Sequence, residues 1–176
     1  ESMTLAQRVQ AAFAAVRGHQ MAKAAVEMAA WDLAARQRGV SLSTLLSSSR
    51  QARGAGAPRT FIESGVSIGI QDSLDELVER VAIERAAGYR RVKIKIKPGW
   101  DIRAVERIRE RFGDISLMVD ANAAYTLEDA PRLAELDQFD LMMIEQPLDY
   151  DDIHDHARLQ ADLRTAICLE EAIHTV

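Results

Sequence analysis

Hydrophobic and polar residues follow two different periods along the chain, and the change comes near residue 58. Between Thr4 and Arg38 the sequence is rich in alanine and free of proline, with Gly18 as its only interruption. Within it, "QMAKAAVEMAAWDLAARQ" repeats apolar residues at the helical spacing of three to four positions. One face of this helix carries Met21, Ala25, Met28, Trp31 or Asp32, and Ala35. We expect this stripe to pack in a core rather than to bind a cofactor.

The segment at 41–59, "SLSTLLSSSRQARGAGAPR", has the serine, glycine and alanine content that is typical of a linker. We therefore predict a domain boundary between Arg53 and Pro58. In this interpretation, residues 1–58 are a helical domain with its linker, and residues 59–176 are a second domain.

After the linker, short apolar runs alternate with amphipathic segments without a break. The apolar runs predict strands at 64–70, 92–96, 116–120, 141–147 and 166–171. The amphipathic segments predict helices at 73–88, 101–113, 126–136 and 151–163. The helix ends carry their own signals, which are capping boxes at Ser73/Glu76 and Thr126/Asp129, a candidate cap at Asp101, and stops at Gly88 and Gly113.

Apolar strands that alternate strictly with helices indicate a parallel sheet covered by helices. Two architectures have this pattern. A doubly wound nucleotide-binding sheet usually has a glycine-rich first turn, and neither G-x-G-x-x-G nor a P-loop sequence occurs here. A (β/α) barrel instead places its reactive groups at the carboxyl ends of successive strands. We therefore predict an α/β protein with about five strands of a partial (β/α)8, TIM-type barrel.

The predicted strand at 92–96 alternates β-branched residues with Lys93 and Lys95. An exposed edge strand has this pattern, because lysines at an edge prevent aggregation. In a barrel, Val92, Ile94 and Ile96 would face the helices, and the lysines would face the interior, where ammonium groups need partners. We favour the interior, because this strand lies between two others in the repeat.

Four charged residues stand at or near the ends of consecutive predicted strands: Lys95, Asp120, Glu145 and Glu170. Each lies 25 residues after the one before it, which is the length of one βα unit. Because parallel strands end at the same rim of a barrel, we expect one ammonium group and three carboxylates to meet there.

Three carboxylates from adjacent strands form the hard oxygen site that Mg²⁺ prefers, and Mn²⁺ or another divalent ion is an alternative. A histidine site is not expected, because His154 and His156 point in different directions on one helix and His19 and His174 stand alone. A lysine beside such a cation can have its pKa lowered, which makes Lys95 a candidate general base.

The composition of the chain limits the classes of binding partner and the cellular compartment that we expect. The 176 residues carry a net charge of −5 without a basic tract, which argues against nucleic acid and anionic membranes as partners. The single cysteine, Cys168, has apolar neighbours, so we expect a buried structural thiol and a reducing compartment. No run of 18 apolar residues and no signal peptide is apparent, so we expect a cytoplasmic protein.

These residues resemble the enolase superfamily and its muconate-lactonizing branch. The matching stretches are "KIK" at 93–95, "VDAN" at 119–122, "IEQPL" at 144–148 and "CLEEAI" at 168–173. The likeness is strongest to the o-succinylbenzoate synthase and N-acylamino acid racemase group. It implies Mg²⁺-dependent removal of a proton α to a carboxylate through an ene-diolate intermediate, which ends in dehydration, as in menaquinone biosynthesis, or in racemisation.

The resemblance implies a role for each matching residue. Asp120, Glu145 and Glu170 would bind Mg²⁺. Lys95 would be the acid/base lysine, with Lys93 lowering its pKa and polarising the substrate carboxylate. Ser67 and Asn122 match positions that line the substrate pocket. The helical segment "AKAAVEMAAWDLAAR" is similar to the later part of the α+β capping domain of these enzymes.

The sequence departs from the family pattern in three respects. The third ligand is Glu170 in "LEEA" instead of Asp in "LDES". The second catalytic lysine of the family would lie beyond Val176, and the first strands of the capping domain are absent. Because a (β/α)8 barrel needs roughly 200 to 250 residues, we expect a piece of a longer enzyme.

The alternatives are a dipeptide epimerase, a muconate cycloisomerase or a catalytically silent half-barrel. As partners of the protein we expect a small-molecule carboxylate substrate and further copies of the chain. A homo-oligomer would cover the open edges of the sheet.

Overall fold

The computed structural model describes residues 4–51 and 61–173. The chain divides into two compact units, Glu1–Ile62 and Glu63–Val176. The predicted domain boundary, between Arg53 and Pro58, lies outside the described residues.

The described part of the first unit is helical. Its helices are α1 (Leu5–Phe13), α2 (Gln20–Gln37) and α3 (Leu42–Gln51). Helix α3 corrects the sequence interpretation, which assigned its residues to a linker. The Ser41 hydroxyl accepts a hydrogen bond from the backbone N–H of Thr44, and Leu45 is buried. A capped, partly buried turn therefore keeps a serine-rich segment helical.

The expected core stripe of α2 is also corrected. Ala35 is buried, but the side chains of Met21 and Met28 are 89% and 63% exposed. Sequence spacing placed these residues on one face correctly, yet spacing does not say what covers that face. The described residues of this unit bury Ala30 and Ala35 and leave Met21, Ala25 and Met28 open to solvent.

The second unit contains one parallel sheet with helices between its strands. Its strands are β1 (Gly65–Ile68), β2 (Arg91–Lys95), β3 (Ser116–Asp120), β4 (Ile144–Glu145) and β5 (Ile167–Cys168). Its helices are α4 (Leu74–Ala86), α5 (Ile102–Phe112), α6 (Ala130–Ala134) and α7 (His154–Asp162), and 3₁₀ turns η1 (Leu127–Asp129) and η2 (Glu135–Phe139) flank α6.

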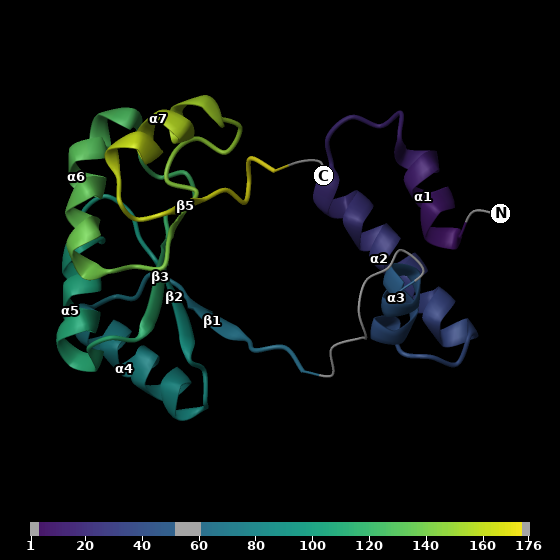
Figure 1. Cartoon of the computed structure of the whole chain (residues 1–176), viewed down its shortest axis with the longest axis horizontal. Helices are drawn as coiled ribbons and strands as arrows, with labels where there is room; N and C mark the ends of the chain where they lie inside the picture. Colours follow the sequence, from purple (N-terminus) through teal and green to yellow (C-terminus); the bar gives the residue numbers. More distant parts are fainter. Residues whose placement is uncertain (1–3, 52–60, 174–176) are drawn as a thin grey trace. The chain divides into compact units, whose positions relative to one another are not determined.

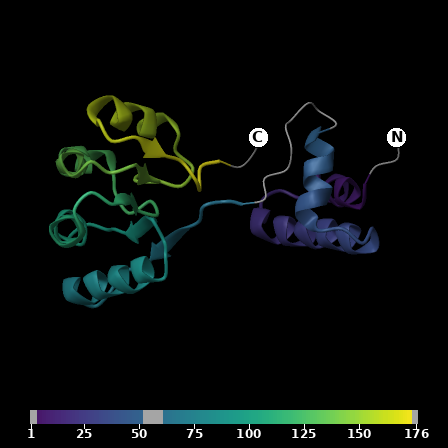
Figure 2. The ribbon, with the colours of Figure 1, turned by 60° about the horizontal axis from the view of Figure 1, so that its bottom comes forward.

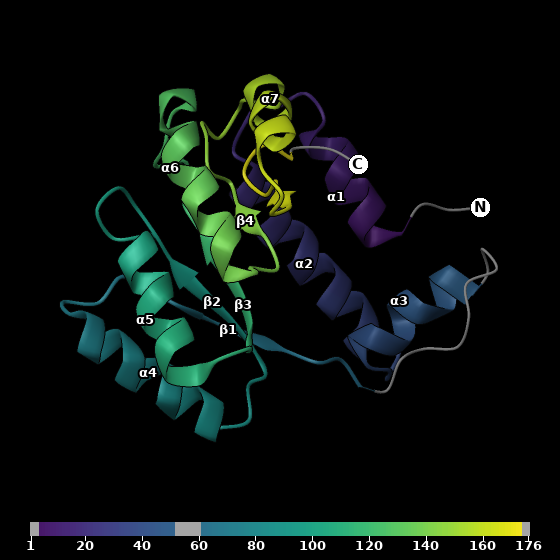
Figure 3. The same ribbon diagram turned by 60° about the vertical axis from the view of Figure 1, so that its left-hand side comes forward.

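The strand order is β1-β2-β3-β4-β5, and every neighbouring pair is parallel. A doubly wound sheet reverses its order partway, which puts helices on both faces. With sequential order and right-handed crossovers, all helices lie on one face. Figures 1 and 2 show α4 to α7 along the outside of a curved sheet, and Figure 3 turns this helical side toward the viewer. The unit therefore has the architecture of a partial (β/α)8 barrel, as the sequence predicts.

Strand β2 confirms the predicted two-faced pattern. Val92, Ile94 and Ile96 are buried in the core between sheet and helices. Lys93 and Lys95 lie on the opposite, inner face. Because β2 pairs with both β1 and β3, the edge-strand alternative is excluded.

Strands β4 and β5 pair over two residues each, which is shorter than the predicted runs at 141–147 and 166–171. Asp140 and Gln146, with φ of 49° and 40°, adopt left-handed conformations on either side of β4. An extended strand cannot continue through such residues. In the predicted run at 141–147, Leu141 and residues 144–147 are buried and Met142 is exposed, and Ile144–Glu145 is the part that pairs as a strand.

Candidate active site

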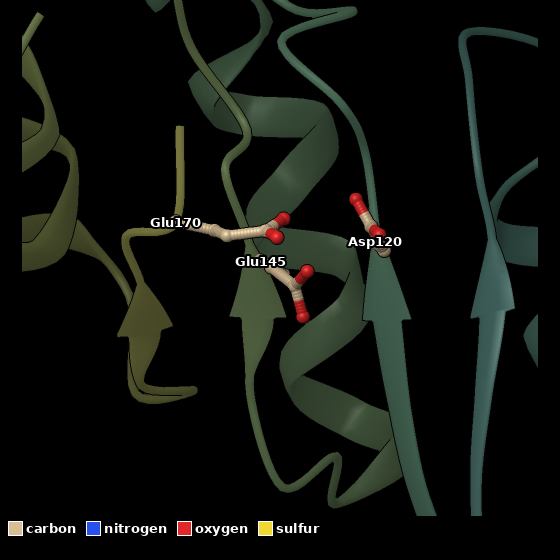
Figure 4. Close-up of side chains that lie close together, drawn as sticks. All are labelled: Asp120, Glu145 and Glu170. Carbon is tan, nitrogen blue, oxygen red and sulfur yellow. The ribbon is translucent and has the colours of Figure 1, made fainter. Parts of the chain in front are cut away.

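Three carboxylates converge at the carboxyl end of the sheet. Asp120 ends β3, Glu145 ends β4, and Glu170 follows β5 by two residues. Figure 4 shows their side chains directed toward one another. One carboxylate oxygen from each residue lies within 4.8 Å of the other two. The acids predicted from their spacing are therefore brought together.

The 25-residue spacing in the sequence does not mean that all four residues are aligned across the sheet, because Glu170 is not in register with the other three. Lys95, Asp120, Glu145 and Cys168 are side by side across the four strands β2 to β5. Glu170 belongs to the next level of the barrel and is exposed, whereas Asp120 and Glu145 are 0% and 5% exposed. Its carboxylate reaches the cluster from a loop rather than from a strand.

Both lysines of β2 pair with these carboxylates. The Nζ of Lys93 lies 2.7 Å from Oε1 of Glu145 and 3.2 Å from Oδ2 of Asp120. The Nζ of Lys95 lies 2.5 Å from Oδ2 of Asp120, and it also donates to the side-chain oxygen of Asn122. The two inward lysines are therefore neutralised by carboxylates on the neighbouring strands β3 and β4.

The charges of the cluster perturb one another. Burial opposes the charged form of Lys93, but hydrogen bonds to Glu145 and Asp120 outweigh it and raise its pKa. Burial also opposes ionisation of Asp120, yet Lys95, the N–H of Asn122 and Lys93 lower its pKa. Burial, together with repulsion from Asp120, raises the pKa of Glu145 despite its hydrogen bond to Lys93. Such opposed shifts within one cluster are typical of functional sites.

Asn122 lies within the cluster, next to Asp120 and Lys95. Its backbone N–H donates to Oδ1 of Asp120 at 3.0 Å, and its φ of 42° is left-handed. Its side-chain N–H₂ donates to Oε1 of Glu171 at 2.9 Å, while its oxygen accepts from Lys95. The amide orientation is therefore fixed by an acid on one side and an ammonium group on the other.

Ser67 lies on the inner face of β1, one strand away from the lysines. It lines a cavity of about 310 Å³ together with Lys93, Met118 and Glu145. Its Cα is the register partner of Lys93. The two pocket residues implied by the resemblance, Ser67 and Asn122, therefore lie on two sides of the same lysine pair.

Sequence reasoning missed Glu171. Its Oε1 accepts from Asn122, and its Oε2 is buried without a hydrogen-bond partner among the described residues. Glu171 directly follows the predicted ligand Glu170, and the sequence alone predicts no role for it. Its contact with a loop after β3 depends on tertiary structure, and no local signal in the sequence identifies it.

The remaining metal-binding residue types are not part of the cluster. Cys168 is half-buried, and burial raises the pKa of its thiol, as expected for a structural cysteine. His156 is buried on α7, His154 is exposed, and His174 lies outside the described residues. Within residues 4–51 and 61–173, the three acids are the one group with metal-ligand geometry.

Two families match the chain. The family described as enolase C-terminal domain-like matches residues 76–176. The N-terminal domain of the mandelate racemase/muconate lactonizing enzyme family matches residues 2–47. The two matches follow the two units of the structure.

Similar proteins include an o-succinylbenzoate synthase from Geobacillus kaustophilus, 53% identical over 93% of this chain and 41% of that protein. An N-succinylamino acid racemase from Amycolatopsis is 45% identical over 98% of this chain and 45% of that protein. Among solved structures, L-talarate/galactarate dehydratase from Salmonella typhimurium, liganded with Mg and L-lyxarohydroxamate, superposes with a TM-score of 0.66 at 34% identity. That match covers 82% of this chain and 36% of the dehydratase. The chain thus spans less than half the length of its relatives.

Proposed function

Because the chain belongs to the enolase superfamily, with domains of the mandelate racemase/muconate lactonizing enzyme type, we propose a Mg²⁺-dependent proton-abstraction function. The reaction is removal of the proton α to a carboxylate, as in o-succinylbenzoate synthase or N-acylamino acid racemase. The observation that carries the proposal is the convergence of Asp120, Glu145 and Glu170 beside two lysines.

The donor set fits a hard divalent cation. Three carboxylates supply oxygen ligands without a thiolate or imidazole, which suits Mg²⁺ or Mn²⁺. Their two ammonium partners leave one excess negative charge in the cluster, so a cation is electrostatically favoured. When bound, the metal would supply positive charge that stabilises the carboxylate of the substrate as its α-proton leaves.

The two lysines would have different roles in the reaction. Lys93 would bind the substrate carboxylate through its charge, and Lys95 would accept the proton from the adjacent carbon. Asn122 accepts a hydrogen bond from Lys95 and so holds its ammonium group toward the cluster. Ser67 and Asn122 would line the substrate pocket, where the cavity beside Lys93 offers room for a small molecule.

The product of the reaction is proposed only as one of the two outcomes known for this group of enzymes, dehydration or racemisation. The likeness to a synthase supports dehydration, as in menaquinone biosynthesis, and the likeness to a racemase supports reprotonation. Both begin with the same proton abstraction, which the described residues would perform. A dipeptide epimerase or muconate cycloisomerase would share this first step.

Assembly and location are proposed from more general features. The unpaired edges of β1 and β5, at the two ends of the described sheet, support a homo-oligomer. The single cysteine supports a cytoplasmic protein. No helix of the described residues is long and apolar enough to cross a membrane.

The metal site is tested by thermal unfolding with and without Mg²⁺. At one hundred times its dissociation constant, a ligand of the folded state stabilises by about 2.7 kcal/mol, which raises the melting temperature by several degrees. We expect Asp120→Asn to abolish this rise, because it removes a buried ligand. Asp114→Asn, at an exposed position, is the matched control and should retain it. An unchanged melting temperature in the parent protein would favour the silent half-barrel.

The base is tested by exchange of the substrate α-proton for deuterium in D₂O, measured by NMR. We expect Lys95→Ala to lower the exchange rate by at least about 100-fold, since a positioned general base contributes that much. Lys97→Ala, an exposed lysine on the same segment, should leave the rate unchanged. Exchange that survives Lys95→Ala would exclude Lys95 as the base.

A further inference from the structure

Glu170 is placed differently from the other two carboxylates. Asp120 and Glu145 are held by strand pairing, but β5 ends at Cys168. Glu170 is exposed and lies beyond the last paired residue, yet its carboxylate joins the cluster. Something other than the strand must fix the backbone of this loop.

Gln146 contacts this loop directly. Its side-chain Oε1 accepts hydrogen bonds from the backbone N–H of Glu170 at 3.0 Å and of Ala172 at 3.4 Å. Its Nε2 donates to the carbonyl of Asp149 at 3.1 Å, which fixes the orientation of the amide. The residue is 0% exposed, so these bonds form away from competing water.

The backbone of Gln146 is also unusual. In an extended strand its side chain would point to the face opposite Glu145. Its φ of 40° is left-handed, which non-glycine residues rarely adopt and which marks functional positions when the surrounding contacts maintain it. Its own N–H donates to the carbonyl of Cys168, and its carbonyl accepts from Ala123. Gln146 therefore connects the loops that follow β3, β4 and β5.

We propose that Gln146 is a positioning residue that holds the loop carrying Glu170, so that the third carboxylate completes the metal site. This inference rests on the proposed function, since it takes Asp120, Glu145 and Glu170 as the ligands. Gln146 itself binds no metal; it acts on Glu170 through the backbone. Partners of ligands that act in this way typically contribute 10- to 100-fold to metal affinity.

A second glutamine provides a matched control. Gln160 accepts a hydrogen bond from Ile167, the first residue of β5, at 2.7 Å and donates to the carbonyls of Leu163 and Thr165. It thus secures the entry of the same strand through the same kind of side chain. Its contacts lie at the end of β5 away from Glu170.

The test is isothermal titration calorimetry with Mg²⁺ on folded parent protein, Gln146→Met and Gln160→Met, below their melting temperatures. Methionine keeps the size of glutamine and removes its hydrogen bonds. We expect Gln146→Met to weaken Mg²⁺ binding by about tenfold or more and Gln160→Met to leave it within about twofold, although both lower the melting temperature. Equal affinities in the two variants would overturn the proposal.

Amide hydrogen exchange in the metal-free parent protein is an independent measurement that needs no variant. We expect the N–H of Glu170 to be protected, because it donates to Gln146. Rapid exchange at Glu170 would overturn the proposal even if Gln146→Met fails to fold. Absence of Mg²⁺ binding by the parent protein, with Glu170 protected, would instead reject the proposed metal site.

Discussion

Asp120 and Glu145 show how two acids on neighbouring strands acquire opposite properties. Asp120 accepts from two lysines and from the N–H of Asn122, so its pKa falls despite burial. Burial raises the pKa of Glu145, and repulsion from Asp120 adds to this effect. The hydrogen bond from Lys93 does not outweigh them. The difference lies in the number of donors that each carboxylate faces, not in its residue type.

His156 illustrates the same dependence on surroundings at another single residue. Its Nε2 accepts from the backbone N–H of Leu148 at 3.0 Å, and its Nδ1 contacts the carbonyl of Asp152. The ring therefore fastens the loop that follows Glu145 to the start of α7. His154, two residues earlier, is exposed.

We expect His156→Phe to destabilise the protein by about 2 kcal/mol, because it leaves the N–H of Leu148 and the carbonyl of Asp152 buried without this partner. His154→Phe should change the free energy of unfolding by no more than about 0.5 kcal/mol, as exposed positions do. Urea unfolding measures both. Equal effects would show that the hydrogen bonds of His156 contribute nothing.

At the scale of elements, Asp101 joins the start of α5 to α6 and to the segment that follows β3. It caps α5 through the N–H of Ile102, and its two oxygens accept from Arg132 of α6 at 2.6 Å each. The Tyr125 hydroxyl donates to it at 3.0 Å. Sequence reasoning identified the cap but not the ion pair, because Arg132 lies 31 residues away.

The Asp101 pair predicts a pH dependence of stability. Burial opposes ionisation of Asp101, but Arg132, the N–H of Ile102 and Tyr125 lower its pKa below the ordinary value. Its stabilising contribution is therefore complete above about pH 4, the pKa of an unfolded aspartate, and is lost as pH falls through the lower folded pKa.

We expect Asp101→Asn to cost about 2 kcal/mol at pH 7, since charged hydrogen bonds contribute about that much, and less as pH falls below 4. Ser73→Ala removes the uncharged cap of α4 and should cost about 1 kcal/mol at both pH values. Urea unfolding at pH 7 and at pH 3 compares the two. A constant cost for Asp101→Asn would contradict the ion-pair interpretation.

At the scale of the whole molecule, the groups of the proposed function all lie in one of the two units. The three carboxylates, both lysines and Asn122 all belong to the unit Glu63–Val176. The helical unit contributes none of these groups. The candidate metal site is therefore formed by residues of the unit Glu63–Val176.

We expect a protein that begins at Glu63 to have the same Mg²⁺-dependent rise in melting temperature that is expected for the longer chain. Thermal unfolding of both proteins, with Asp120→Asn as the common control, measures this. A rise that disappears with the helical unit would show that residues before Glu63 are needed to form the site.

The local pattern of the chain predicted the order of strands and helices in the unit Glu63–Val176 and the two faces of β2, but it missed helix α3. Alternation along β2 predicted that Val92 and Ile94 pack on helices while Lys93 and Lys95 face inward, because side-chain direction in a strand depends only on position. The 25-residue spacing predicted that Asp120 and Glu145 meet, because parallel strands end at one rim. Each of these inferences depends on the geometry of a single strand or of two adjacent strands.

Tertiary structure alone decided the contacts of the loops that follow the strands and the exposure of the apolar face of α2. Sequence spacing could not show that Glu170 lies past its strand, that Glu171 contacts Asn122, or that Met21 is exposed. Each of these depends on which groups from distant parts of the chain satisfy a buried polar atom or cover an apolar face. Such contacts form between residues with no shared period, so no local pattern records them.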